Sequence, residues 1–489
     1  MLGPWQSHAE FRWWLEKRLE ELFQHYEPLV RFHAGILEKV YVLDLDPLQE
    51  LMTFSYSCMG RPAVKQAQIF RALVVMNHYK QGISAFVFRL KSDPVLAAAC
   101  GFEPDSVPGV GTFYDFLDRL WLEAAPGKVL REPLKKGKKS KSKEKLPESD
   151  PNIVARLVEQ VMAGYFFEDK PERLLQKILA ECAVKPSAKL GLLGNTQNLV
   201  VAGDGAPLET GASPYGRKVC SCKTLGIYRC SCPRYYSDPT ANWGWDSYHE
   251  RWFYGHTLYQ LTAANSFNDL PLLINLPQGS RHDSVTSVRA FAQLTSLYPE
   301  FKFVAGLFDS AHDAYDIYKL LGVYEIEPFI DLNKRNETNH TYPKAKIDEK
   351  GIPVCPANLN MLNWGFENKR QRNKWRCPLY KSPEDCTYRE QCSPSAYARV
   401  VYTKPADDPR LFTKTPRGSK SWKKAYARRT SVERSLKRTL VDYLLESLRL
   451  RADKRWVAFA TLCALNQHMD AQVAASKSTL FHKLGLKAA

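Results

Sequence analysis

The chain has 489 residues, of which 44% are hydrophobic, enough for two to four domains with substantial cores. Its 69 Lys and Arg against 52 Asp and Glu give a net charge of +17, which favours nucleic acid as a partner, with an anionic membrane surface second. No stretch approaches the about 18 apolar residues of a membrane span and the N-terminus has no signal-peptide pattern, so we expect a cytoplasmic, nucleoid-associated protein without a membrane partner.

Residues 1–130 are predicted to form a helical N-terminal domain. Ile69, Leu73 and Met76 recur at helical spacing, and Gly82 then interrupts the pattern, as expected for short helices joined by turns. We expect this domain to serve DNA binding and dimerisation. Five of its basic residues are candidates to face phosphate, although scattered basic residues more often form an ordinary solvated surface: Lys65, Arg71, Lys80, Arg89 and Lys91.

Residues 131–151 are predicted to be a flexible basic linker. The sequence "LKKGKKSKSKEKLPESDP" is dense in lysine and nearly free of large apolar residues, so it cannot bury enough surface to order itself. Two interpretations stay open: a simple tether, and a segment that also holds DNA non-specifically by releasing counterions.

After a helical stretch at 152–183, the pattern changes to that of an α/β core. Apolar runs bounded by turn residues predict five strands, at 199–203, 252–265, 270–277, 302–309 and 324–331. The first three follow one another without a helix and favour antiparallel pairing, whereas the later ones alternate with helices and favour parallel pairing. We therefore predict a mixed five-stranded sheet within 152–333, an insertion at 334–412, and a helical C-terminal part of the core at 413–489.

Two of these strands end in an aspartate. Leu199 to Ala202 is a short apolar run that leads into Asp204, and Gly203 and Gly205 on either side allow other groups to approach the backbone closely. The apolar run "FVAGLF" leads into Asp309 in the same way. A turn or helix-cap role is the alternative for Asp204. If the strands are neighbours, the two carboxylates lie within reach of one divalent metal ion, whose preferred ligands are oxygens.

Glu433 is the candidate third carboxylate. It is a single acid between Arg417 and Arg438, a stretch rich in Lys and Arg. An ordinary helical ion pair with Arg429 or Lys437 is the alternative. Three carboxylates from separate segments suit two Mg²⁺ ions about 3.5 to 4 Å apart that act in phosphodiester chemistry.

With Asp204, Asp309 and Glu433 in this strand order, and the pattern Tyr426-x2-Arg429-x3-Glu433 around the last acid, the chain resembles the DDE transposases of bacterial insertion sequences. The likeness covers essentially the whole chain, including "GRP" and "GVGTFYDFLDRL" in the N-terminal domain. It implies a multidomain protein with a ribonuclease-H-like catalytic core, in which the three acids hold Mg²⁺ or Mn²⁺. It also implies double-stranded DNA, both transposon ends and target, as the partner of a homodimer.

The resemblance further implies that Tyr426 and Arg429 contact DNA near the cleaved phosphate. The family pattern places a lysine seven residues after the glutamate, where this chain has Leu440; Lys437 or Arg438, one turn earlier, is the candidate substitute. We list the predicted DNA-binding residues as Tyr426, Arg429, Arg434, Lys437, Arg438, Arg370, Arg372 and Lys374.

Two groups of cysteines are candidate zinc sites, because thiols in a reducing compartment are more often metal ligands than disulfides. "CSCKTLGIYRCSC", within a Cys-rich loop at 218–234, has two C-x-C pairs separated by a tight turn. The second group lies in the insertion, where zinc would hold together a segment without a core of its own. Free thiols are the alternative for both groups, which are Cys220, Cys222, Cys230 and Cys232, and Cys355, Cys377, Cys386 and Cys392.

His282 and Asp283 enter a predicted helix and could border the site, although capping by Asp283 is the favoured interpretation. The sequence as a whole predicts a transposase that binds terminal inverted repeats, cleaves DNA with Mg²⁺, and transfers the freed strand. Two other functions stay open: a zinc-containing, catalytically inactive sequence-specific DNA-binding protein, and a structure-selective nuclease of the same fold.

Overall fold

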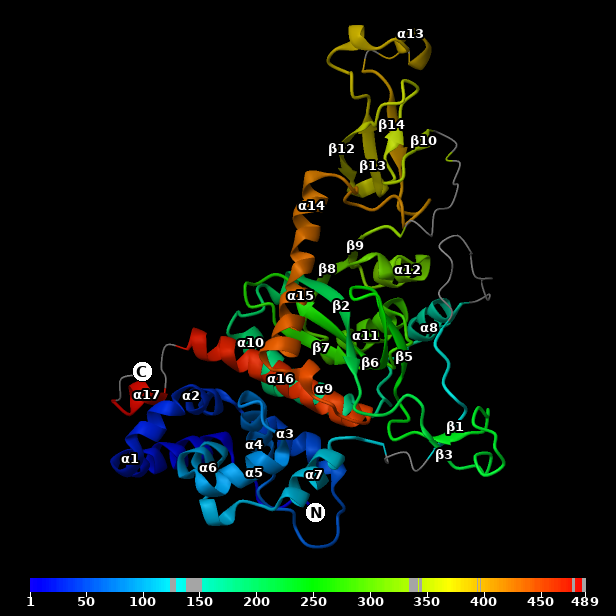
Figure 1. Ribbon diagram of the computed structural model, residues 1–489. Coiled ribbons are helices and arrows are strands. Elements are labelled where there is room, and N and C mark those ends of the chain that lie inside the picture. The colour runs from blue at the N-terminus through cyan, green and yellow to red at the C-terminus, as the bar shows by residue number, and fades with distance from the viewer. Residues whose placement is uncertain are drawn as a thin grey trace.

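The computed structural model describes residues 1–123, 129–137, 152–333, 342, 345–393, 395, 397–476 and 480–485. Most of the predicted basic linker, and residues 334–341 and 343–344 of the predicted insertion, lie outside the described residues. Three regions are visible in Figure 1: a helical region at the N-terminus, a central sheet with its helices, and a protruding arm above them.

The N-terminal region is helical, as predicted. Its first helix begins with a capping box, in which Ser7 and Glu10 each bond the other's backbone N–H. Farther along, Asp93 caps a later helix that ends at Gly101, whose φ of +86° suits glycine. The helices are α1 (His8–Phe32), α2 (Ala34–Val42), α3 (Asp46–Met52), α4 (Gln66–His78), α5 (Ile83–Ser92), α6 (Pro94–Cys100) and α7 (Val110–Arg119).

Among the basic residues of this region, Arg71 is fully buried. Its guanidinium lies 3.4 Å from the centre of the Phe11 ring and donates to the Cys100 carbonyl at 3.2 Å. The interpretation that Arg71 faces phosphate is therefore wrong: its charge is used inside the helical core.

The central sheet is mixed, as predicted, but has six strands rather than five. Its order is β5-β6-β2-β8-β9, with β7 also paired to β6. β6 pairs antiparallel with β2, β5 and β7, while β2, β8 and β9 are parallel. The strands are β2 (Leu199–Glu209), β5 (Asn242–Asp246), β6 (Arg251–Ala263), β7 (Pro271–Asn275), β8 (Phe303–Phe308) and β9 (Glu327–Ile330).

Helices cover both faces of this sheet. Phe308 of β8 packs on Phe291 of α11 (Asp283–Leu297), with ring centres 5.4 Å apart. On the other face, Gln260 of β6 donates to Ser435 of α15 (Thr430–Lys437) at 2.7 Å. The remaining helices of the core are α8 (Ile153–Met162), α9 (Arg173–Leu179), α10 (Lys185–Lys189), α12 (Tyr315–Val323) and α14 (Lys420–Tyr426).

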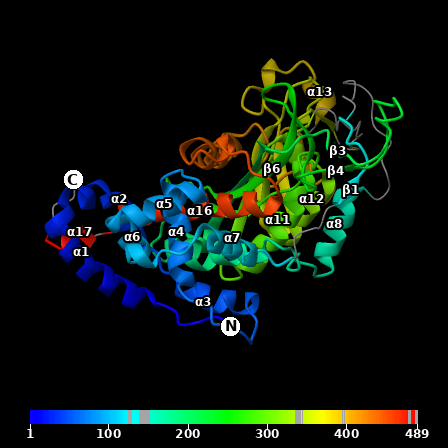
Figure 2. The same cartoon turned by 60° about the horizontal axis from the view of Figure 1, so that its bottom comes forward.

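One long helix, α16 (Asp453–Ala475), lies between the N-terminal helices and the sheet (Figures 1 and 2). Asn466 donates to the Asn77 side chain of α4 at 2.9 Å, and His468 bonds the Pro271 carbonyl of β7 at 2.8 Å. Nearly all of its side chains from Trp456 to Met469 are buried. A helix that is buried all round joins the two regions in one continuous core. A short helix, α17 (Leu480–Lys483), follows it.

Two excursions leave the core. The cysteine loop, residues 213–235, follows β2 and carries β3 (Arg217–Lys218) and β4 (Arg234–Tyr235); β4 also pairs with β1 (Leu130–Arg131), so the start of the predicted linker is a strand. The arm comprises the described residues of 345–403. Its elements are β10 (Lys346–Ile347), β11 (Pro353–Val354), β12 (Leu362–Glu367), β13 (Arg372–Arg376), α13 (Arg389–Cys392) and β14 (Val400–Thr403).

Candidate active site and metal centres

Asp204 and Asp309 lie side by side because β2 and β8 are parallel neighbours. The register pairs Ala202 with Leu307, so Asp204, two residues farther along β2, is level with Asp309 at the end of β8. Side chains alternate along a strand, and a Cβ on either neighbour of Asp204 would meet groups of the α11 side, Phe308 at Gly203 and Asp283 at Gly205, so Asp204 points to the opposite face, where α15 lies. Asp309 follows the end of β8 and bonds His312.

Glu433 lies on α15 and is linked to Asp204 by Arg429. The Arg429 guanidinium lies 3.3 Å from Oδ2 of Asp204 and also bonds Oε1 of Glu433. The helical ion pair considered as the alternative for Glu433 is thus present, but the same arginine also holds Asp204. One positive charge is therefore shared by carboxylates that are 229 residues apart in the chain.

The electrostatic environment shifts the pKa values of Asp204 and Asp309 in opposite directions. Burial, together with repulsion by Asp309 and Asp283, raises the pKa of Asp204 to about 6. Burial would also raise the pKa of Asp309, but the Nδ1–H of His312 donates to its Oδ1 at 2.7 Å and the net effect is a lowered pKa. The other ring nitrogen of His312 lies 3.0 Å from the Tyr259 hydroxyl. Asp309 is thus oriented by a fully buried histidine.

Asp283 is a fourth carboxylate near Asp204, so it borders the candidate site, which the sequence analysis had considered but not favoured. The cap of α11 is His282, whose ring accepts from the Ser284 N–H, so the predicted capping by Asp283 is wrong. Asp283 instead lies against Gly205, where an added Cβ would be 2.6 Å from its Oδ1. The glycines around Asp204 do permit close approach, as predicted, since a Cβ on Gly203 would be 2.6 Å from Phe308.

The cysteine loop brings all four of its cysteines together. The Sγ atoms of Cys220 and Cys230 are 3.7 Å apart, and those of Cys222 and Cys232 are 3.6 Å apart. A tetrahedral zinc with Zn–S bonds of about 2.3 Å has S···S edges of roughly 3.8 Å, so the donor set fits this ion. Among the described residues, these cysteines alone form a set of three or more metal-binding side chains with ligand atoms within 4.8 Å of one another, and the three acids do not.

The second cysteine group gathers around the outer part of the arm, but less tightly. Cys355 and Cys377 are buried, whereas Cys386 and Cys392 are partly exposed. Burial, together with the proximity of the other three thiols, raises the pKa of Cys377. The four cysteines are therefore neighbours in the fold, although they are spread over 38 residues of sequence.

Two of the arginines predicted to bind DNA from α15 have partners within the chain. Arg434 makes two bonds to Asp269 in the β6–β7 turn, at 2.6 and 3.0 Å, and Arg438 donates to the Asn268 carbonyl at 2.7 Å. Lys437 is well exposed, 3.9 Å from Asp442. Lys437, not Arg438, thus presents an exposed charge one turn from Glu433.

Tyr426 is half-buried and stacks on Trp422, with ring centres 4.5 Å apart. In the arm, Arg370 is exposed near Glu367, whereas Arg372 pairs with Glu367 at 2.7 Å and lies over the Tyr402 ring. Lys374 stands in the middle of β13, opposite Tyr402. The predicted DNA-binding residues therefore divide between exposed and internally paired side chains.

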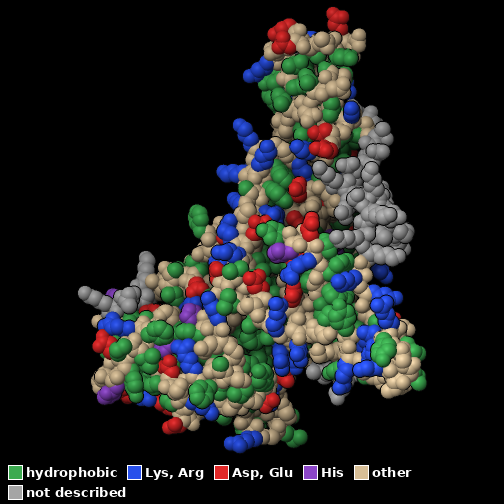
Figure 3. Space-filling model, viewed as in Figure 1, with side chains coloured by type: hydrophobic (Ala, Val, Ile, Leu, Met, Phe, Trp, Pro, Cys, Tyr) green, Lys and Arg blue, Asp and Glu red, His purple; other side chains and the backbone are tan. Residues whose placement is uncertain are grey.

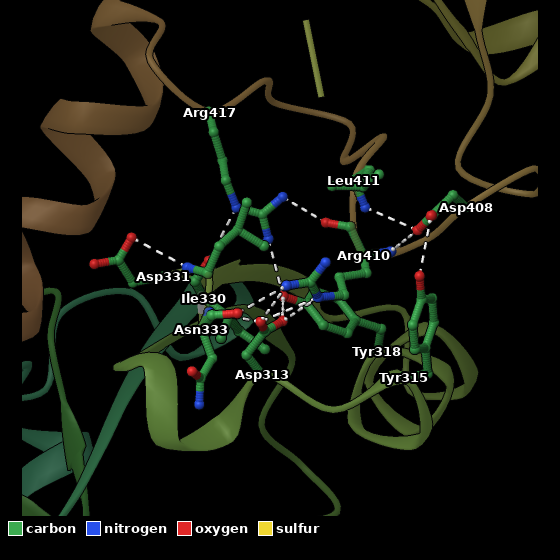
Figure 4. A network of polar contacts seen from close by, with 11 residues as sticks. Asp313, Tyr315, Tyr318, Ile330, Asp331, Asn333, Asp408, Arg410, Leu411 and Arg417 are labelled. Atoms are coloured by element: carbon green, nitrogen blue, oxygen red, sulfur yellow. Dashed lines mark hydrogen bonds and ion pairs between the residues drawn. The ribbon is translucent and has the colours of Figure 1, made fainter. Parts of the chain in front are cut away.

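A buried ion pair fixes the base of the arm next to the site (Figure 4). Asp313 follows His312 directly and is fully buried, and Arg410 holds both its oxygens, at 2.7 to 3.0 Å. Tyr318 and the backbone N–H of Asn333 also donate to this carboxylate. Arg417 completes the network through the Ile330 carbonyl and the Tyr318 hydroxyl. The turn that carries Asp309 therefore also anchors the arm.

In the part of the chain that the structure describes, no helix is long and apolar enough to cross a membrane. No curated protein and no solved structure matches the chain. The pattern of one family, described as Transposase domain (DUF772), matches residues 17–119, which span most of α1 through α7. The helical N-terminal region of this chain therefore matches a transposase domain, and this match supports an insertion-sequence transposase.

Proposed function

We propose that this protein is a DDE transposase: it binds the terminal inverted repeats of its element, cleaves DNA with Mg²⁺ or Mn²⁺, and transfers the freed strand. The observation that carries the proposal is that Asp204, Asp309 and Glu433, from three distant segments, meet on one face of the sheet around Arg429. The order β7-β6-β2-β8-β9, with β6 alone antiparallel to β2, supports a ribonuclease-H-like core.

The donor set suits a hard divalent cation. Carboxylate oxygens are the preferred ligands of Mg²⁺. Burial and mutual repulsion already disfavour the charge of Asp204, and a cation at this place relieves both. When bound, such ions activate the attacking oxygen and stabilise the leaving oxygen of a phosphodiester. The protein's part is to orient Asp309 through His312 and to hold Asp204 and Glu433 together through Arg429.

DNA contacts in this proposal come from exposed cations and rings near the site. Lys437 and Arg370 are exposed and make only long ion pairs, with Asp442 and Glu367, so they can meet phosphates, and Tyr426 and Arg429 flank the acids. Arg434, Arg438 and Arg372 would act by holding the surface in shape, since each already has an internal partner. We further propose that two copies act together on paired ends.

Both cysteine groups are proposed zinc sites that order segments with little core of their own. Metal analysis of the purified protein checks this. Cys220→Ser with Cys230→Ser should remove one zinc per chain, and Cys377→Ser with Cys386→Ser should remove a second. Unchanged zinc content in either double variant eliminates that site.

The function is tested with DNA carrying the inverted repeats that flank the reading frame. Asp204→Asn, Asp309→Asn and Glu433→Gln should each abolish Mg²⁺-dependent cleavage and strand transfer while leaving end binding nearly intact. Glu446→Gln, a change of an exposed acid outside the cluster, is the matched control. Strand transfer by any of the three variants removes that residue from the site. Binding without cleavage by the unaltered protein indicates a pure DNA-binding protein, and cleavage without joining indicates a nuclease.

A further inference from the structure

The cysteine loop has no core. Throughout residues 213–235 every side chain is at least partly exposed, and the first buried residue after them is Tyr236. The peptide N–H groups of Leu225, Gly226 and Ile227 close a tight turn on the carbonyls of residues 221–223. Besides β3 and β4, the four thiols and the bonds from Lys218 and Arg234 to carbonyls of the loop hold this segment together. Its tip is thus a small rigid knuckle once a metal is bound.

Large apolar side chains project from the tip into solvent. Leu225, Ile227 and Tyr228 are exposed by 71%, 50% and 69%. None of them contributes to any core cluster. These three neighbouring apolar residues are therefore not explained by burial within the folded chain. A partner that covers them would explain them.

The charge around these residues is entirely positive. Between Thr210 and Ser237 there is no Asp or Glu. Four thiolates and one Zn²⁺ together carry a charge of −2, which the positive charge of the five basic residues of the loop exceeds. These residues are Arg217, Lys218, Lys223, Arg229 and Arg234. Lys, Arg and hydrophobic side chains lie next to one another on the protrusion that carries β1 and β3 (Figure 3).

We propose that the tip of the cysteine loop is a DNA-contacting wedge. Leu225 and Ile227 enter the minor groove and part a base step, while Lys223 and Arg229 bind the flanking phosphates. Apolar wedges flanked by cations are a common way for proteins to engage the minor groove. The inference rests on the proposed function in one respect, namely that the partner is duplex DNA.

A second copy of the chain is a poorer occupant. A symmetric interface would place the same cations of both copies face to face, which is repulsive. Three apolar side chains also fall short of the roughly 800 Å² per partner that a stable protein interface buries. DNA can contact the cations through its phosphates and the apolar side chains through a groove, so it satisfies both features of the tip.

The place of the loop also suits DNA bound at the acids. β2 continues for five residues beyond Asp204 to Glu209, and the loop follows shortly after. At about 3.4 Å per residue, β2 ends roughly 17 Å along the strand from Asp204, which corresponds to about five base pairs. The strand that carries Asp204 thus leads toward the cysteine loop, and the proposal has one duplex span both.

The test compares two double variants of the full-length, zinc-loaded protein on a duplex containing the flanking inverted repeat. Lys223→Ala with Arg229→Ala should lower the slope of log K against log salt by about 2. Leu225→Ser with Ile227→Ser should weaken binding about tenfold at an unchanged slope, and abolish the fluorescence rise of a 2-aminopurine placed at the contacted step. Leu190→Ser with Val323→Ser, which changes residues of similar exposure elsewhere, is the control and should bind normally.

Zinc content and oligomeric mass are measured for every variant. If both loop variants keep the DNA affinity and the salt slope of the unaltered protein, the inference is overturned. If, in addition, their oligomeric mass is lowered, the tip is assigned to an interface with a second copy. Cleavage by the unaltered protein is scored on the same duplex. If that protein binds through the loop and never cuts, the transposase proposal fails while the wedge stands.

Discussion

Glycine 205 sets how closely Asp283 approaches the strand that carries Asp204. A methyl group there would be 2.6 Å from one oxygen of Asp283 and 3.0 Å from the other. The Asp283 carboxylate is in the first turn of α11, so it must rotate or the helix must shift to make room for that methyl group. The space next to Gly205 is therefore occupied by a fourth acid.

Gly205→Ala is expected to lower the free energy of unfolding by about 1 to 3 kcal/mol and to reduce cleavage. Gly322→Ala, in α12 with open space around the added methyl, should leave stability unchanged or raise it by up to about 1 kcal/mol. Urea unfolding measures both. Equal stability of the two variants would show that Asp283 moves freely.

Two histidines, His78, which is partly buried, and His468, which is fully buried, make the fold sensitive to acid. Burial lowers the pKa of His78 to about 4, helped by Lys39, and burial lowers the pKa of His468 to about 4. Both titrate near 6.5 in an unfolded chain. Between pH 6.5 and about 4 the unfolded state thus binds more protons, and stability falls as the pH is lowered.

We expect each histidine to contribute a loss of up to about 1.4 kcal/mol per pH unit within this window, and none below it. Thermal melts between about pH 7 and pH 4 measure the loss. His78→Gln keeps an acceptor for Lys39 and should flatten the dependence. An equally steep decline in the variant would exclude His78 as a source.

At the scale of elements, the arm depends on one buried ion pair. Arg410 and Asp313 are almost fully buried, and the pair joins the start and end of the excursion to the turn after β8. Removing one partner leaves an uncompensated charge inside the protein, which typically costs about 3 to 5 kcal/mol.

Arg410→Met is therefore expected to release the arm. Limited proteolysis should cut the variant near both ends of the arm while the sheet remains intact, and cleavage activity should fall because Asp309 lies on the same turn. Lys381→Met, at an exposed position of the arm, is the control. Resistance of the Arg410 variant to protease would mean that the remaining contacts suffice.

The sequence predicted elements well where one strong pattern decided them. β8 lies where the apolar run before Asp309 predicted it. β2 begins at Leu199 as predicted, but it continues to Glu209, so Asp204 lies within the strand and not at its end. β5 was missed because "NWGWD" is short and its pairing with β6 supplies the stability that its own sequence lacks. Asp283 was misjudged since a first-turn acid matches a cap pattern, and its contact with Gly205 exists only in three dimensions.

At the scale of the whole molecule, the transposase domain and the sheet share a core through α16. We expect them to unfold together. Hydrogen exchange should give the slowest amides of α4 and β2 the same opening free energy, while those of the arm and the cysteine loop open at lower cost. A clearly lower value for α4 would show that the N-terminal helices open independently.

The position of α16 also imposes an order on biosynthesis. The helix that covers α4 begins at Asp453, so the ribosome has made more than nine-tenths of the chain before that surface can be covered. Until then, apolar groups of the first domain stay in contact with water and available to chaperones. Prematurely terminated products should consequently be aggregation-prone and unable to compete for DNA, which leaves only full-length chains to act.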